Sequence, residues 1–141
     1  MYTIEEFDKE KTKILRYVLY KKRTEKEVKQ KFLETDDEML NDIINDLKEK
    51  GYIDDSNYIE KQVNEFMKLK TLSIKEIKYK LLQKGLNKSI IEDYIDNNRE
   101  ALEEYEKQGM NKIKLKKSNN MEEDEIKNYL LKRGFRNNDD F

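Results

Sequence analysis

One segment of the chain occurs three times at a spacing of 49 residues, and this repeat constrains the fold more than any other sequence feature. Its middle copy, residues 73–86, places Glu76 three residues after Ser73 and ends on glycine and leucine, a pattern typical of a capped helix and its stop. Equivalent residues begin at Thr24 in the first copy and cover residues 125–135 in the third. A motif that keeps its cap, apolar residues and charges at a fixed period indicates a tandem array of helical units.

The composition favours a folded helical chain over a disordered or strand-rich one. Charged residues make up 43% and hydrophobic residues 35% of the chain, but the net charge is only −1 and the apolar residues recur at helical spacing. The chain has no proline, so only its four glycines and its polar caps interrupt helices. No segment alternates between apolar and polar residues for more than a few positions. We therefore predict an all-α protein.

The repeat predicts an elongated tandem array of three-helix modules in which the third module is incomplete. The expected divisions are a flexible N-terminal lead-in over residues 1–8, a first module over residues 9–53, a second module over residues 54–97 and a partial third module over residues 98–141. In the middle helix of the second module, Ile77, Leu81 and Leu82 have the spacing of a stripe that faces the core.

Charge is segregated along the chain in step with the repeat. The middle helices are rich in lysine, whereas the third helices are rich in aspartate and glutamate. If equivalent helices lie on one side of a stacked array, their lysines form a basic stripe that suits phosphate groups or an acidic protein groove. Surface lysines are more often simply solvated, which is the competing interpretation. The candidate contact residues of this stripe are Arg23, Lys26, Lys29, Lys75, Lys78, Lys80, Lys84, Lys127 and Arg133.

The sequence lacks the residues that most enzyme sites need. It has no histidine and no cysteine, which removes the usual nucleophile–base pairs and zinc-ligand sets. Its isolated glycines form none of the glycine-rich loops that bind nucleotide phosphates, and Asp54 and Asp55 lack the spacing of a calcium loop. We expect no enzyme activity, no metal and no cofactor. No apolar run is long enough to span a membrane, so we expect a cytoplasmic protein, and a monomer.

Three blocks of sequence have a distinctive order and spacing. They are Leu-Arg-Tyr at residues 15–17 with Arg-Thr-Glu-Lys-Glu-Val at residues 23–28, Lys-Gly-Tyr-Ile-Asp-Asp at residues 50–55, and Ser-Ile-Lys-Glu-Ile at residues 73–77 with Leu-Leu-Gln-Lys-Gly-Leu at residues 81–86. Taken together they resemble the RecX family, bacterial regulatory proteins that act on the RecA recombinase. The match is clear over residues 13–95 and weaker from there to Phe135.

The resemblance implies an elongated array of three-helix modules that binds along the helical groove of the RecA–DNA filament. In that family, binding lowers the ATPase and strand-exchange activities of RecA and promotes filament disassembly in recombination and DNA repair. The partners implied are the RecA filament and single- or double-stranded DNA. The residues leave two alternatives: a direct DNA-binding module similar to a winged helix, which requires a strand pair after Ile53, and a helical-repeat scaffold for another protein.

Overall fold

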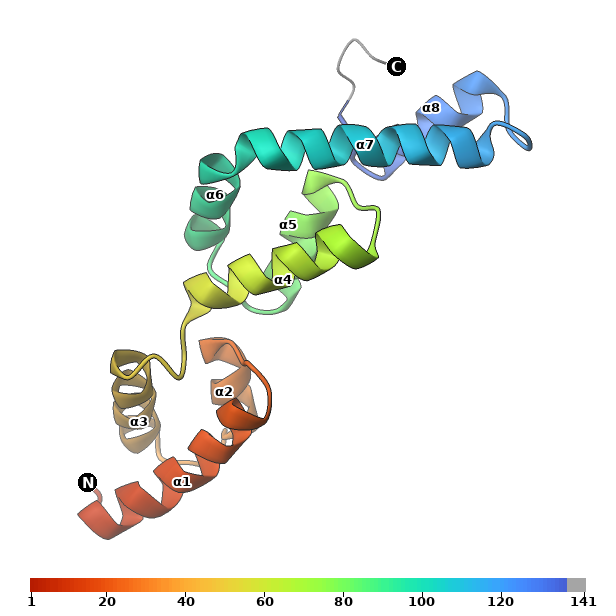
Figure 1. Cartoon of the computed structure of the whole chain (residues 1–141). Coiled ribbons are helices and arrows are strands. Elements are labelled where there is room, and N and C mark those ends of the chain that lie inside the picture. The colour runs from red at the N-terminus through yellow and green to blue at the C-terminus, as the bar shows by residue number, and fades with distance from the viewer. Residues whose placement is uncertain (137–141) are drawn as a thin grey trace.

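The computed structural model describes residues 1–136, and within this range the chain forms eight helices and no strand (Figure 1). In chain order the helices are α1 (Ile4–Tyr20), α2 (Glu25–Lys31), α3 (Asp37–Glu49), α4 (Asp55–Leu69), α5 (Ile74–Gln83), α6 (Lys88–Asn97), α7 (Arg99–Lys117) and α8 (Glu123–Lys132). The predicted all-α fold class is confirmed. Residues 137–141 of the predicted third module lie outside the described residues.

In the described part of the chain, three hydrophobic clusters, and not one common core, hold the helices together. Helices α1–α3 enclose the first cluster, α4–α6 with the start of α7 enclose the second, and the rest of α7 with α8 encloses the third. Figure 1 shows these groups following one another along an elongated molecule, with α1 and α8 at opposite ends. We call α1–α3 the first module, α4–α6 the second and α7–α8 the third. The predicted residue boundaries between modules stay a prediction.

Helix α7 is shared between two clusters. Leu102 in its second turn packs in the second cluster, whereas Met110 and Ile113 pack in the third. Its apolar residues do not follow the 49-residue period, because the turn after α5 contains a Gly-Leu pair that the first module lacks. From the third helix of a module onward the period becomes 51, as the starts of α3 at Asp37 and α6 at Lys88 show.

Helix α1 begins at Ile4, so most of the predicted flexible lead-in over residues 1–8 is helical. The Thr3 side chain caps the helix by accepting a hydrogen bond from the backbone N–H of Glu6 at 3.1 Å. Tyr2 and Phe7 pack against the first cluster with their rings stacked at 5.9 Å between centroids. The cap and the aromatic pair extend the helix beyond the stretch that the aliphatic pattern predicts.

Two further sequence-based expectations differ from the structure. Leu82 is 37% exposed instead of facing the core, whereas Ile77 and Leu81 are fully buried as expected. The winged-helix alternative lacks its strand pair, because α4 begins at Asp55, two residues after Ile53, and continues to Leu69. None of the helices in the described residues is long and apolar enough to cross a membrane.

Candidate functional site

Helices α2 and α5 are the middle helices of the first and second modules, and each begins at a residue whose hydroxyl group forms two hydrogen bonds. The hydroxyl oxygens of Thr24 and Ser73 each accept a hydrogen bond from the backbone N–H three residues later, at 3.1 and 3.0 Å. The same hydroxyls donate to the carbonyl oxygens of Lys84 and Arg133, at 3.0 and 2.8 Å. Thr24 and Ser73 are both 0% exposed. The start of α2 is therefore bonded to the end of α5, and the start of α5 is bonded to the end of α8.

A glycine at each contact lets a lysine side chain cross the helix end. Gly85 and Gly134 have φ angles of 87° and 89°, in the left-handed region that favours glycine. A Cβ atom on Gly85 would lie 2.5 Å from the side chain of Lys26, and a Cβ on Gly134 would lie 2.9 Å from that of Lys75. Both the backbone and the neighbouring lysine therefore require glycine here.

A carboxylate from the next module completes each contact. The Asp55 side chain in α4 accepts from the backbone N–H of Glu25 at 3.1 Å, and the Glu106 side chain in α7 accepts from the backbone N–H of Ile74 at 2.7 Å. Both N–H groups lie in the first turn of a helix, where they have no partner within the helix. Glu106 is only 5% exposed. Burial raises the pKa of Asp55, because it disfavours the charged form.

Two equivalent sets of residues thus join three modules. We call the contact of α2 with the second module the first joint, made by Thr24, Lys26, Asp55, Lys84 and Gly85, and the contact of α5 with the third module the second joint, made by Ser73, Lys75, Glu106, Arg133 and Gly134. Since the same backbone groups bond in both joints, successive middle helices meet in the same way.

Four of the predicted contact residues lie at the joints. Lys26 and Lys75 are exposed, lay their alkyl stems on the glycines, and have no hydrogen bond or ion pair within residues 1–136. Lys84 is also exposed. Arg133 differs, because its guanidinium forms an ion pair with Glu76 at 3.0 Å and donates to the Thr71 carbonyl at 2.6 Å. Arg133 therefore holds the second joint together.

The remaining predicted residues are spread over α2, α5, α8 and the turn before α2. Lys29 pairs with Glu25 in its own helix at 3.3 Å, and Lys78 reaches from α5 to Glu92 of α6 at 3.0 Å. Lys127 is exposed on α8. The structure therefore brings the predicted lysines to equivalent places in successive modules, and gives two of them carboxylate partners within their own module.

Arg23 and Lys80 occupy different surroundings. The Arg23 guanidinium lies over the ring of Tyr17, 4.1 Å from its centroid, and the Arg23 Nε atom is buried without a hydrogen-bond partner. Lys80 is half-buried and lines a shallow groove of about 470 Å³ with Lys70 and Lys84. Arg23 thus lies just before the first joint, whereas Lys80 belongs to a groove between α4 and α5.

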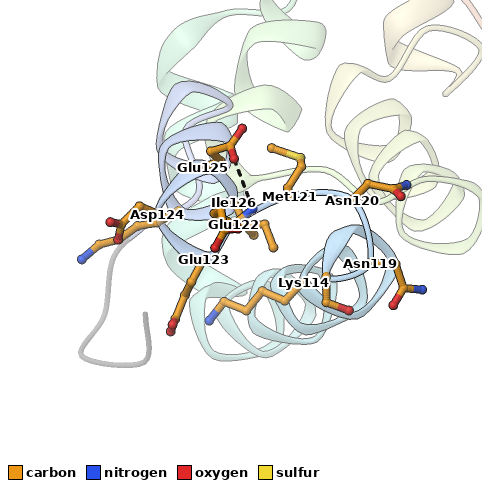
Figure 2. A pocket seen from close by; sticks show the side chains of 11 residues that line it. Lys114, Asn119, Asn120, Met121, Glu122, Glu123, Asp124, Glu125 and Ile126 are labelled. Atoms are coloured by element: carbon orange, nitrogen blue, oxygen red, sulfur yellow. Dashed lines mark hydrogen bonds between the residues drawn. The ribbon is translucent and has the colours of Figure 1, made fainter.

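A different hollow, of about 690 Å³, lies at the turn between α7 and α8 (Figure 2). Four consecutive carboxylates line it, from Glu122 to Glu125, and the backbone N–H of Glu122 donates to the Glu125 side chain at 3.2 Å. Such carboxylates stabilise a helix start, and their charge disfavours phosphate groups. In residues 1–136, no group of acidic side chains has the arrangement of a metal site.

The sequence predicts the cations that lie at the joints but not the hydrogen bonds that make the joints. Thr24 and Ser73 are recognisable as helix caps, but nothing local indicates their second hydrogen bond to a carbonyl 60 residues away. Asp55 and Glu106 are acidic residues that no local feature of the sequence marks for contact with another module. Their equivalence could have been found from the 51-residue offset that relates α4 to α7.

The sequence of this chain is similar to those of known regulatory proteins. No protein-family model matches the chain. The regulatory protein RecX of Finegoldia magna is 38% identical over 84 residues, which cover 58% of this chain and 41% of the relative. The regulatory protein RecX of Clostridium acetobutylicum is 31% identical over 140 residues, which cover 89% of this chain and 62% of the relative. The chain therefore spans less than two thirds of the length of these two relatives.

The architecture has a match among solved structures. The crystal structure of RecX from Lactobacillus salivarius aligns with a TM-score of 0.80 at 27% sequence identity, over 95% of this chain and 91% of that one. The similarity therefore extends through the helices of all three modules.

Proposed function

The chain belongs to the RecX family, and on this premise we propose that it is a non-catalytic, cytoplasmic regulator of the RecA recombinase. It binds along the groove of the RecA–DNA filament as a monomer. Binding inhibits the ATPase and strand-exchange activities of RecA and lowers the stability of the filament during recombination and DNA repair.

The equivalence of the two joints is the observation that carries this proposal. A filament repeats the same surface along its length, and a ligand that repeats its own contact surface can engage the filament at more than one point. Each added contact is then intramolecular, which raises the overall affinity. The bond from Thr24 to Lys84 and the bond from Ser73 to Arg133 hold successive middle helices in equivalent contacts.

The contact residues in this proposal are cations of the predicted stripe, both those at the joints and those farther along the middle helices, Lys29, Lys78 and Lys127. Lys26, Lys75 and Lys84 are exposed, and no carboxylate within residues 1–136 pairs with them. Lys29 and Lys78 can exchange their carboxylates for a partner, because ion pairs at the protein surface contribute only about 0–1 kcal/mol and both pairs are partly exposed. We assign Arg133 a positioning role, since its guanidinium is occupied inside the second joint.

The direct test is the rate of ATP hydrolysis by RecA on single-stranded DNA during titration with this protein. A suitable RecA is that of Clostridium acetobutylicum, whose RecX is a relative. We expect the rate to fall to a plateau as the protein saturates the filament, and the protein alone to hydrolyse no ATP. An unchanged RecA rate at saturating protein would overturn the proposal.

A further inference from the structure

A groove between α7 and α8 carries only cationic, polar and aromatic side chains apart from one isoleucine. It measures about 360 Å³. Its lining residues are Thr71, Lys112, Ile113, Lys116, Lys117, Asn120, Tyr129 and Arg133. None of them is acidic, although glutamate and aspartate are as numerous in this chain as lysine and arginine. The groove is therefore a concentrated positive surface on a molecule that is close to neutral.

The second module has the equivalent groove, between α4 and α5, with different chemistry. That groove is lined by Gln62, Glu65, Phe66, Leu69, Lys70, Lys80, Gln83 and Lys84. With the 51-residue offset between α4 and α7, Glu65 corresponds to Lys116 and Phe66 to Lys117. The groove has the same place in both modules, so packing alone does not demand lysine at these positions.

The cations of the α7–α8 groove differ in how free they are to bind a ligand. Lys112 and Lys116 are exposed and have no ion pair within residues 1–136. The Lys117 ammonium lies over the Tyr129 ring, 4.3 Å from its centroid. The Arg133 charge is already balanced by Glu76. Lys112, Lys116 and Lys117 are thus the cations available to an anionic ligand.

The helix dipole explains only part of this arrangement. Cations near the C-terminal end of a helix stabilise it wherever they lie around the last turn. Lys112 precedes the last turn of α7, and all three lysines line one groove. A shared groove without carboxylates is what a ligand with several negative charges would require.

We propose that this groove binds the phosphodiester backbone of single-stranded nucleic acid. A single strand is narrow and flexible enough to follow a groove between two helices, and lysines that track its phosphates supply affinity without reading sequence. Because Lys117 covers the ring of Tyr129, this tyrosine supports the lysine instead of stacking on a base. The proposal deepens the proposed function, and in that sense rests on it, by assigning the DNA contact to Lys112, Lys116 and Lys117, which are not among the residues of the predicted basic stripe.

The test is binding of a fluorescently labelled oligothymidylate, followed by anisotropy without RecA. The test variant is Lys112→Gln/Lys116→Gln, and Lys9→Gln/Lys68→Gln is a control with the same charge change at exposed lysines on α1 and α4. Each lost phosphate contact reduces the slope of log affinity against log salt by about 0.7. We therefore expect the test variant to bind about 10- to 30-fold more weakly near 0.1 M salt, with a slope smaller by about 1.4.

The control and two competitors decide the outcome. The control variant should bind within about twofold of the unaltered protein, and circular dichroism should show all the proteins equally helical. Equal loss in both variants, or no loss in the test variant, would overturn the proposal. So would tighter binding of duplex of the same length, or equal displacement by polyglutamate. If the test variant binds DNA weakly but still inhibits the RecA ATPase, the groove is the DNA-binding site and inhibition of RecA does not depend on it.

Discussion

The two joints make the same backbone contacts but differ in the side chain at the end of the incoming helix. At the first joint this residue is Lys84, which is exposed, and at the second it is Arg133, which binds Glu76 and the carbonyl of Thr71. The planar guanidinium of arginine can hold two acceptors at once, whereas the lysine ammonium is a compact and strongly hydrated charge. The backbone and the buried hydroxyls therefore define a joint, and the terminal cation either reinforces it or remains available to a partner.

The largest expected effect comes from the glycines at the joints. Gly85→Ala would place a non-glycine residue in the left-handed region and force the Lys26 stem away, with a loss of about 2–3 kcal/mol of stability. Gly51→Ala is a matched control, because Gly51 has a φ of 80° and no atom lies within 4 Å of its added Cβ. Its loss should be only about 1–2 kcal/mol. Urea unfolding measures both losses of stability. Equal losses would show that the contact between residue 85 and Lys26 at the joint contributes nothing.

The next effect concerns the buried hydroxyls. Thr24→Val removes a helix cap and leaves the Lys84 carbonyl without its donor, so we expect a loss of about 2 kcal/mol. Ser73→Ala should lose a similar amount at the second joint. Thr3→Val removes only a cap, on an exposed helix end, and should lose about 1 kcal/mol. Thermal unfolding measures all three losses. If all three variants lost the same stability, the hydrogen bonds between modules would contribute nothing measurable.

Exchanging the cations at the helix ends, Lys84 and Arg133, tests whether they cause the difference between the two joints. Arg133→Lys should destabilise the protein by about 1 kcal/mol, because lysine cannot hold Glu76 and the Thr71 carbonyl together. Lys84→Arg places a guanidinium at the position equivalent to Arg133, where Glu27 corresponds to Glu76 in the 49-residue repeat, and should gain at most about 0.5–1 kcal/mol. Urea denaturation of both variants tests this asymmetry. If Arg133→Lys left the free energy of unfolding unchanged, the guanidinium of Arg133 would not stabilise the second joint more than Lys84 stabilises the first.

The smallest effect on stability, with a large effect on function, is expected for cations outside the joints. Reversing Lys29, Lys78 and Lys127 to glutamate should weaken inhibition of the RecA ATPase while circular dichroism remains native, because none of the three lysines is buried and the ion pairs of Lys29 and Lys78 contribute little. The control is the same reversal at Lys9, Lys21 and Lys68, three exposed lysines of α1, its C-terminal cap and α4. Full inhibition by the test variant would show that these lysines do not contact the filament.

The predictable part of the fold is the part encoded locally. The repeat, the capping boxes at Thr24 and Ser73, and the glycine stops are readable because each depends on residues only a few positions apart. The early start of α1 was missed because Thr3 and the Tyr2–Phe7 ring pair do not extend the aliphatic pattern.

The predictable part of the site is smaller, for a physical reason. The positions of the lysines follow from the repeat, but their partners depend on how modules pack. Nothing near Arg133 in the sequence reveals that its charge is balanced by Glu76, 57 residues away. In the same way, burial of Glu106 follows from its place against the start of α5 and not from its neighbours in α7.

Co-sedimentation with RecA filaments tests the central claim most directly. RecA assembled on single-stranded DNA is pelleted with the unaltered protein and with the Lys29, Lys78 and Lys127 reversal, and the bound protein is quantified against DNA-free RecA. We predict saturable binding of the unaltered protein to the filament and weaker binding of the variant. Absence of the unaltered protein from the filament pellet at saturating concentration would contradict the claim that this chain is a regulator that acts on the RecA filament.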